Sequence, residues 1–296
     1  MLFRSESRQI ETALGIKALV SLSDHDDINA GMQLRVLSGG SEVPVSVEWT
    51  IPFGKTFFHI GVHNLAIDQA PSIIAEMNRV TAAPDENEVA AILHWVGENP
   101  ETLVVFNHPA WDENHVGPRI HHEHLEAFLS RYRHSLHAVE LNGLRPWKEN
   151  RVAAALAAEV RMPLVSGGDR HGREPNACVN VTNAASFGEF VREVRGDGYS
   201  EIVFMPQYRE SLPIRIIENM GNILDDDPEH AMGWLHWSDR VFYETDTQGV
   251  KSLAQLWGGK FPSVVNQFVG LMHLVKFRQV RSALRMALND RTDFVL

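Results

Sequence analysis

Short apolar runs of strand character recur through the first two thirds of the sequence, and helical patterns separate most of them. The strand-like runs cover 16–22, 43–50, 56–62, 103–106, 137–141, 162–165 and 202–204. Helical patterns cover 6–15, 124–132, 150–160 and 186–195, and two more helices are expected after Pro71 and Asp85. Strands that alternate with helices predict a parallel sheet, either open or closed into a barrel.

The first run, 16–22, is apolar almost without a break. Such a run is typical of a parallel sheet covered on both faces, so we expect a central strand with a neighbour on each side. The runs 43–50 and 56–62 flank the segment Pro52-Phe53-Gly54-Lys55, which has the composition of a turn. These two runs therefore predict a hairpin.

Acidic and imidazole side chains cluster at or just beyond the ends of these runs. They are Asp24 and His25, then Glu48 and His59 on the predicted hairpin, His108, Glu140, and finally Asp169 and His171. The carboxyl ends of barrel strands meet at one face, and that face carries the site in α/β barrels. The pattern therefore favours a barrel and predicts one polar site at its end.

Composition narrows the classes of protein to consider. The chain has 296 residues, enough for one large α/β barrel or two domains, and its 22% charged content suits a soluble globular protein. A net charge of −11 argues against nucleic-acid binding, because phosphate backbones are held by excess lysine and arginine. The single cysteine, Cys178, excludes an internal disulfide, and neither a signal peptide nor a membrane-length apolar run is visible. We expect a cytoplasmic protein that does not bind membranes.

The pattern changes after Met205, so we divide the chain into a barrel over 1–205 and a mainly helical extension over 206–296. Within the extension, 271–287 reads as an amphipathic helix with a basic face. A packed helix with a solvated basic face is the favoured interpretation, and a membrane or partner contact is the alternative.

Histidine, aspartate and glutamate without cysteine form a donor set that suits Zn²⁺, Mn²⁺ or Fe²⁺. A carboxylate such as Glu48 can bridge two ions. One histidine at a strand end is usually a solvated or capping residue, but joint recurrence at several ends favours a shared metal site. Glu140 fits a loop cap and a site residue equally well.

Several segments resemble, in order and spacing, the motifs of the PHP (polymerase and histidinol phosphatase) superfamily. These segments are Ser23-Asp24-His25-Asp26, Val47-Glu48, His59-Ile60-Gly61, Asn107-His108-Pro109, Val139-Glu140-Leu141-Asn142 and Gly168-Asp169-Arg170-His171. The resemblance covers roughly 5–205 and implies a distorted (β/α)7 barrel with a centre of two or three divalent metals, Mn²⁺, Fe²⁺ or Zn²⁺.

The resemblance also implies roles for individual residues. The implied metal ligands are His25, Glu48, His108, Asp169 and His171, joined by His59, with Glu48 bridging. Asp24 and Glu140 complete the expected set of ligands. Glu48, Asp169 and His171 are also assigned to catalysis. The expected activity is hydrolysis of a small phosphorylated metabolite or nucleotide by a metal-bridging hydroxide. The candidate cations for the phosphoryl oxygens are Arg145, Arg170 and Arg173, and for each of them a plain surface position is an equally open interpretation.

The sequence departs from the superfamily in two places. The family begins with a strand that carries His-x-His, but no histidine precedes His25 here, and Arg170 stands where the family has a small residue. We therefore expect a barrel without its first strand, in a truncated form of a longer enzyme that is weakly active or inactive. Two alternatives stay open: a degenerate PHP-like module that binds metal or ligand without catalysis, and an amidohydrolase-like enzyme that cleaves C–N bonds.

Overall fold

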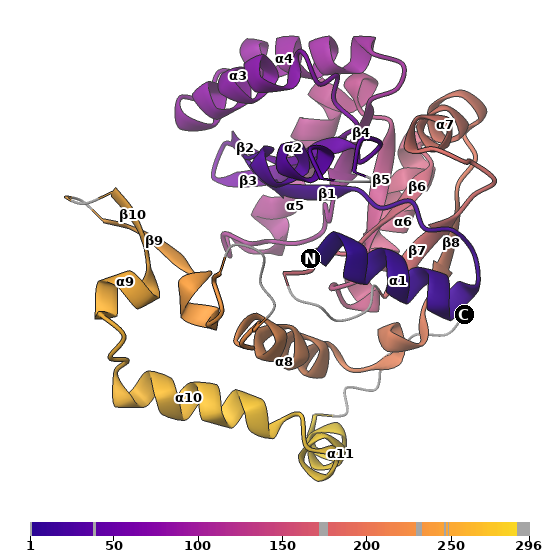
Figure 1. Cartoon of the computed structure of the whole chain (residues 1–296). Coiled ribbons are helices and arrows are strands. Elements are labelled where there is room, and N and C mark those ends of the chain that lie inside the picture. Colours follow the sequence, from indigo (N-terminus) through magenta and orange to yellow (C-terminus); the bar gives the residue numbers. More distant parts are fainter. Residues whose placement is uncertain are drawn as a thin grey trace.

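A mixed six-stranded sheet forms the centre of the protein, in a computed structural model that describes residues 2–37, 40–171, 177–228, 233–245, 247 and 249–288 (Figure 1). Its strands are β1 (Leu22–His25), β2 (Val45–Phe53), β3 (Thr56–His63), β4 (Leu103–Asn107), β5 (Ala138–Asn142) and β6 (Leu164–Gly167). They lie side by side in sequence order. Sequential order is the order of a barrel wall, whereas doubly wound sheets reverse direction at a switch point.

The sheet combines parallel and antiparallel pairs. The pairs β1–β2, β4–β5 and β5–β6 are parallel, and β3 runs antiparallel to both of its neighbours. The predicted hairpin is confirmed, because β2 turns into β3 through Gly54, whose φ of 61° suits glycine. The sheet is strongly twisted and curls like part of a barrel (Figure 1). Among the described residues it does not close, so a complete (β/α)7 barrel is not seen.

The prediction of a central strand over 16–22 is wrong. The strand β1 begins only at Leu22, and β2 is its one ladder partner among the described strands, so β1 lies at a sheet edge. Side-chain hydrogen bonds hold the segment before it. Ser21 Oγ lies 2.8 Å from Ser46 Oγ and 2.9 Å from His63 Nδ1. The apolar character of 16–22 therefore reflects partial burial, and the segment before Leu22 does not pair with another described strand.

Helices cover the outer face of β2, β3 and β4. These are α3 (Ala70–Ala82), α4 (Glu86–Glu98) and α5 (Pro118–Tyr132), which pack against the strands in one apolar cluster. Trp49 of β2 is fully buried there and donates its indole N–H to Thr81 Oγ1 at 3.0 Å. The helix expected after Asp85 is confirmed, and Asp85 Oδ1 accepts from the backbone N–H groups of Asn87 and Glu88.

Two smaller apolar clusters complete the layers. The helix α6 (Trp147–Val160) packs its alanines on β5, whereas α7 (Phe187–Arg192) and the following short π-helix, Glu193–Asp197, pack on the opposite, inner face of the sheet. Ser186 caps α7 as predicted, since its Oγ accepts from Glu189 N. The short helices α1 (Leu2–Leu14) and α2 (Asn29–Arg35) flank β1 in sequence.

A two-stranded antiparallel sheet follows β6, formed by β7 (Cys178–Val181) and β8 (Glu201–Phe204). The run 202–204 is thus a strand, but it is not the last member of a parallel series, and β7 was not predicted. Side chains tie this pair to β6: Ser166 N donates to Asn180 Oδ1 at 2.7 Å, and Ser200 Oγ donates to Leu164 O.

The remainder of the described chain combines helices with one hairpin. It contains Pro206–Arg209 (3-10), α8 (Leu212–Ile223), Trp237–Asp239 (3-10), β9 (Phe242–Thr245), β10 (Gly249–Ser252), α9 (Leu253–Trp257), α10 (Ser263–Leu274) and α11 (Arg278–Ala287). The hairpin β9–β10 was not predicted, and the single helix expected over 271–287 is two helices that meet near Val275. The boundary at 205/206 stays a prediction.

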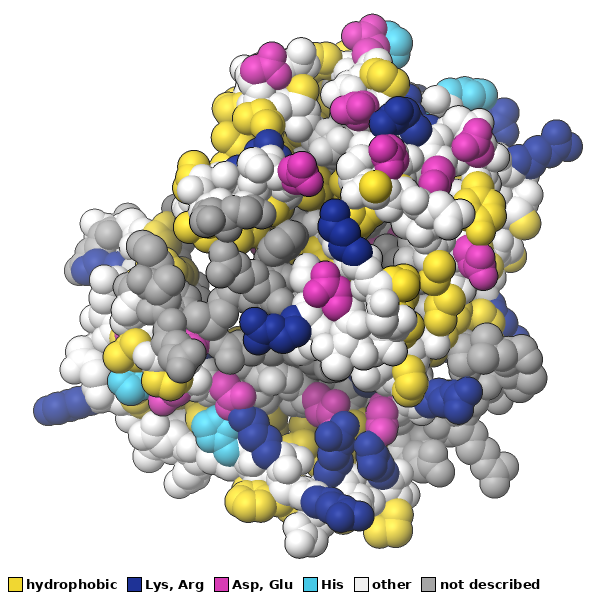
Figure 2. Space-filling model, turned by 45° about the vertical axis from the view of Figure 1, so that its right-hand side comes forward, with side chains coloured by type: hydrophobic (Ala, Val, Ile, Leu, Met, Phe, Trp, Pro, Cys, Tyr) yellow, Lys and Arg dark blue, Asp and Glu magenta, His cyan; other side chains and the backbone are white. Residues whose placement is uncertain are grey.

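Basic side chains gather at the lower edge of the molecule, where α11 lies (Figures 1 and 2). Arg281 pairs with Glu218, and Arg285 pairs with Glu210. Part of the basic face of α11 is therefore neutralised by α8 and the segment before it. Within the described parts of the chain, every helix is too short or too polar to cross a membrane.

Candidate metal centre

The inner face of the sheet changes from apolar to polar along its strands. On β4 the alternate residues of this face are Leu103, Val105 and Asn107, and on β5 the sequence runs from Ala138 to Glu140. The apolar starts pack under α7. The polar residues that follow on the same face line one end of the sheet, because alternate residues of a strand point to the same side. His25, Asn107 and Glu140 lie at or near the carboxyl ends of β1, β4 and β5, whereas Glu48 and His59 lie in the middle of the hairpin strands β2 and β3.

Glu48 lies at the middle of the cluster, 7% exposed. Its Oε1 is 3.0 Å from His108 Nε2 and 3.7 Å from His59 Nδ1, and its Oε2 is 3.8 Å from His25 Nε2. The two carboxylate oxygens thus face different imidazoles. This is the arrangement that a bridging carboxylate needs.

Asn107 orients the Glu48 carboxylate by donating from Nδ2 to Oε1 at 3.0 Å. Gly61 of β3 stands directly opposite Glu48 in the ladder, and a Cβ at Gly61 would come within 2.8 Å of Asn107 Oδ1. A glycine at this register position therefore gives the amide room to reach the carboxylate.

His25 is held beside Glu48 by the end of β1. The two residues are paired in the parallel ladder, and Asp26 N donates to Glu48 O at 3.0 Å. Asp26 Oδ1 in turn accepts from Thr50 N at 2.8 Å. These contacts fix the direction in which the chain leaves the strand, and Asp26 itself adopts a left-handed φ of 52°.

One ligand atom from each of His25, Glu48 and His59 lies within 4.8 Å of the other two. His108 extends this group, with its Nε2 at 3.4 Å from His59 Nδ1. We call these four residues the Glu48 cluster. Three imidazoles around a carboxylate fit a divalent transition metal, since nitrogen and oxygen donors of this kind are its common ligands.

The electrostatics at His59 and Glu48 favour the protonation states that a metal requires. Burial lowers the pKa of His59 to about 3, so this imidazole is neutral at pH 7. Burial acts to raise the pKa of Glu48, but hydrogen bonds from His108 and Asn107 outweigh it, and the pKa falls well below its usual range. Neutral imidazole and ionised carboxylate are the ligand forms of these side chains.

His108 differs from His59. Burial acts to lower its pKa, but the hydrogen bond to Glu48 and the charge of Glu140 outweigh burial and raise it. A proton and a metal cation therefore compete for this imidazole. The backbone at His108 is left-handed, with φ of 26°, and Trp111 packs edge-on against its ring at 5.2 Å between centroids.

Glu140 supports the cluster from β5. Its Oε2 accepts from His108 N at 2.8 Å and from Asn142 Nδ2 at 3.0 Å. The carboxylate lies against Gly167, where any Cβ would overlap it. Burial raises the pKa of Glu140 to about 7. Glu140 is therefore buried and holds the backbone of His108, and its role as a metal ligand stays a prediction.

Asp169 is engaged in an ion pair. Its Oδ2 lies 2.6 Å from Arg145 Nη2, and both side chains are largely buried. The Arg145 guanidinium also stacks on Trp111 at 3.3 Å from the ring centroid. His171 is exposed, and its ring lies 6.4 Å from that of His25 in a stacked arrangement. Asp24 is exposed beside His25 and lies outside the group of three.

The cations expected to bind substrate have different positions. Arg145 is engaged with Asp169, and Arg170 pairs with Glu6 of α1, whose side chain is buried. Arg173 lies outside the described residues. The substrate-binding role of these arginines stays a prediction, but two of them already carry carboxylate partners.

Three residues that shape the site were not predicted: Asn107, Asp26 and Trp111. Asn107 could have been found, because it ends a buried strand on the same face as the catalytic candidates. Asp26 and Trp111 act through loop geometry, which leaves no periodic pattern in the sequence.

Comparison with known proteins gives distant likenesses. No protein-family model and no curated protein matches the chain. Among solved structures, PsfC from Pseudomonas syringae is similar over 74% of this chain and 88% of its own, with a TM-score of 0.48 and 12% identity. Two further structures have lower scores.

One is an amidohydrolase from Chromobacterium violaceum, solved with sulfate and without metal. It is 13% identical over 68% of this chain and 92% of its own, with a TM-score of 0.42. The other, from Bifidobacterium adolescentis, is provisionally named a metal-dependent phosphoesterase. It is 14% identical over 64% of this chain and 89% of its own, with a TM-score of 0.40. None of these likenesses is close enough to assign a family.

Proposed function

We propose that this protein is a metal-dependent phosphoesterase of the PHP type, with its first metal held by the Glu48 cluster. The observation that carries the proposal is the convergence of three imidazoles on one buried carboxylate. The order of the sequence motifs supports the PHP assignment. Asp24, Asp169 and His171 remain proposed ligands for a further ion, and its binding requires Asp169 to part from Arg145.

The chemistry that a divalent metal supplies when bound is Lewis acidity, which polarises a phosphoryl oxygen and acidifies water. The side chains of the protein orient and hold the candidate metal ligands. Asn107 fixes the Glu48 carboxylate, and Glu140 fixes the backbone of His108. The carboxyl of Glu140, with its pKa of about 7, can hold or release a proton near neutral pH.

Phosphate esters are preferred to amides as the substrate class. Amidohydrolase centres of the carboxylated-lysine type need a lysine at a strand end, and none of the strands β1–β6 contains lysine. A non-catalytic metal-binding module is the second candidate. The observation that favours it is the ion pair between Asp169 and Arg145, which engages a residue assigned to catalysis.

The test compares Glu48→Gln with Glu76→Gln, a change in an exposed ion pair on α3. Metal content is measured by elemental analysis after loading with Mn²⁺, Fe²⁺ or Zn²⁺, and a panel of phosphomonoesters and phosphodiesters is assayed with each metal and with chelator. We expect Glu48→Gln to lose metal and ester hydrolysis together, while Glu76→Gln keeps both.

Each other outcome has a definite meaning. Ester hydrolysis that survives chelation contradicts a metal-dependent mechanism. If the wild type binds metal but hydrolyses no substrate, and Glu48→Gln loses the metal, the protein is a non-catalytic metal-binding module. Cleavage of amides but not of esters favours the amidohydrolase alternative.

A further inference from the structure

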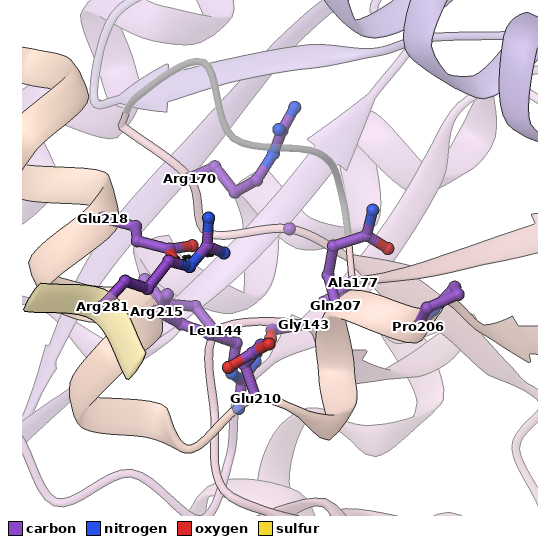
Figure 3. A pocket seen from close by; sticks show the side chains of 11 residues that line it. Gly143, Leu144, Arg170, Ala177, Pro206, Gln207, Glu210, Arg215, Glu218 and Arg281 are labelled. Atoms are coloured by element: carbon purple, nitrogen blue, oxygen red, sulfur yellow. Dashed lines mark hydrogen bonds and ion pairs between the residues drawn. The ribbon is translucent and has the colours of Figure 1, made fainter. Parts of the chain in front are cut away.

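A pocket lies next to Asp169, between the loops that follow β5 and β6 and the helices α8 and α11 (Figure 3). Its volume is about 210 Å³. Its walls include Gly143, Gly168, Arg170, Gln207 and Arg215. Pockets that enclose drug-sized ligands are larger, roughly 300–1,000 Å³, so this one suits a small group.

Arg215 of α8 is the unusual feature of this pocket. It is 7% exposed, and among the described residues it has no carboxylate partner. Its guanidinium donates to the backbone oxygens of Gly143 and Arg145 and lies over the Tyr208 ring, while its Nε is buried without a hydrogen-bond partner. Arginine is seldom buried without an anionic partner.

The remaining charges of the pocket wall cancel in pairs. Arg170 pairs with Glu6, Arg281 pairs with Glu218, and Glu210 pairs with Arg285. Figure 3 shows the Arg281–Glu218 pair at one side of the pocket. The positive charge of Arg215 is therefore left over. Burial also lowers the pKa of Arg215, which reflects the unfavourable position of its charge.

We propose that this pocket binds a small oxyanion, a phosphate or carboxylate group, with Arg215 as its principal cation. Two further features support an anion with several oxygens. The side-chain amide of Gln207 faces the same pocket, where its Oε1 has no hydrogen-bond partner, so rotation of the amide would present its N–H₂ group. Gly168 has no side chain to cover the backbone on that wall, whereas the N–H of Gly143 already donates to Gly167 O.

The position of the pocket gives the bound anion a consequence for the site. Arg215 holds the carbonyls of Gly143 and Arg145, and Gly168 precedes Asp169. An anion here contacts both loops that carry the Asp169–Arg145 pair. Its source is either a free anion or the second anionic group of a substrate at the metal centre. The proposal does not depend on hydrolysis at that centre.

The test is a calorimetric titration of the metal-loaded protein with inorganic phosphate, and separately with acetate. We expect Arg215→Gln to weaken the binding of the preferred anion by about tenfold or more, because a charge-assisted contact is lost. Arg79→Gln, on the far surface of α3, is the matched control and leaves the affinity unchanged. No saturable binding of either anion by the wild type overturns the proposal, as does equal binding by Arg215→Gln.

Arg215 also braces a loop, so its replacement could impair folding. Glu218→Gln provides an independent variant, because it releases Arg281 from its carboxylate and adds positive charge to the pocket. We expect tighter phosphate binding by about threefold or more. Unchanged or weaker binding by a folded Glu218→Gln variant contradicts the proposal.

The Glu48→Gln variant separates the two sources of the anion. Phosphate binding that persists in Glu48→Gln but falls in Arg215→Gln identifies a free-anion pocket, whether or not the protein is a phosphoesterase. Phosphate binding that falls in both variants identifies one continuous site for a substrate with two anionic groups. If phosphate binding falls in Glu48→Gln but not in Arg215→Gln, the phosphate binds at the metal centre, and the proposal of a separate anion pocket is wrong.

Discussion

The two halves of the predicted constellation are built differently. On β1–β4, Glu48 is surrounded by imidazoles and an amide, and its described ion-pair contacts are with histidine. Beyond β5 and β6, Asp169 is bound to Arg145 and the neighbouring Arg170 is bound to Glu6. The same residue types are thus ready for a metal in one half and engaged by guanidinium groups in the other.

The difference shows what a partner does to a carboxylate. His59, kept neutral by burial, can give its lone pair to a metal directly, and His108 has only to lose a proton. Asp169, in contrast, has to leave a close guanidinium contact first. We therefore expect the halves to fill in order, the Glu48 cluster first. Four predictions test this comparison, from the largest expected effect to the smallest.

The largest effect is expected from Glu48→Ala. The change leaves His108 and Asn107 without their shared acceptor in a buried site, and it removes the centre of the metal cluster. We expect a loss of roughly 3–5 kcal/mol in the free energy of unfolding, as when one partner of a buried charged pair is removed. Urea denaturation of metal-free protein measures it. A loss below about 1 kcal/mol would show that Glu48 is not the organiser of this half.

The second prediction concerns His137, at the seam between the halves. Its Nδ1 accepts from Val104 N at 2.9 Å, and burial lowers its pKa to about 4. Between about pH 6.5 and 4 the unfolded chain binds a proton here that the folded chain does not, so stability falls as pH falls. The loss approaches roughly 3 kcal/mol.

Urea midpoints at pH 7.5 and pH 4 measure this loss in the wild type and in His137→Asn, which keeps an acceptor but cannot titrate. We expect the variant to lose less stability on acidification. His134→Asn, at an exposed position, is the control and should follow the wild type. An identical pH dependence of all three proteins would contradict the role of the seam.

A smaller effect is expected from Gly167→Ala. The new Cβ would overlap the Glu140 carboxylate, which must then leave its hydrogen bonds to His108 N and Asn142. The expected destabilisation is about 1–3 kcal/mol, measured by urea denaturation. Gly97→Ala in α4 is the matched control, because its Cβ would meet only His137 Nε2 at 3.9 Å. That change should be neutral or stabilise by up to about 1 kcal/mol.

Much of the fold could be predicted, because the spacing of apolar residues along the sequence shows which side of each helix or strand is buried. The hairpin of β2 and β3, the helix after Asp85 and the cap at Ser186 follow from local patterns and are present. Pairing is not a local property. The run 16–22 was apolar, yet the ladder begins at Leu22 on a sheet edge, and β7 with β8 forms a separate antiparallel pair.

The site divides along the same line. Strand alternation could bring His25, Glu48, His59 and His108 together, because each lies in or next to a ladder position. The partners of Asp169 and Arg170 come from segments distant in sequence, from the loop before α6 and from α1. Such ion pairs depend on tertiary structure, for which the residue types alone give no signal.

The smallest effect, and the sharpest for the comparison, is expected from Asp169→Asn. The change keeps the shape of the side chain and an acceptor for Arg145, which also stays stacked on Trp111. If the Glu48 cluster fills first, the dissociation constant of the first metal should rise less than about threefold, a difference below roughly 0.7 kcal/mol. Competition with a chromophoric chelator measures that constant, with Glu48→Gln as the variant that loses the ion. A large loss of affinity in Asp169→Asn would mean that Asp169 leaves Arg145 to bind the first ion. The ion pair would then be a resting contact that the metal displaces, and the two halves would work as one site from the first ion onward.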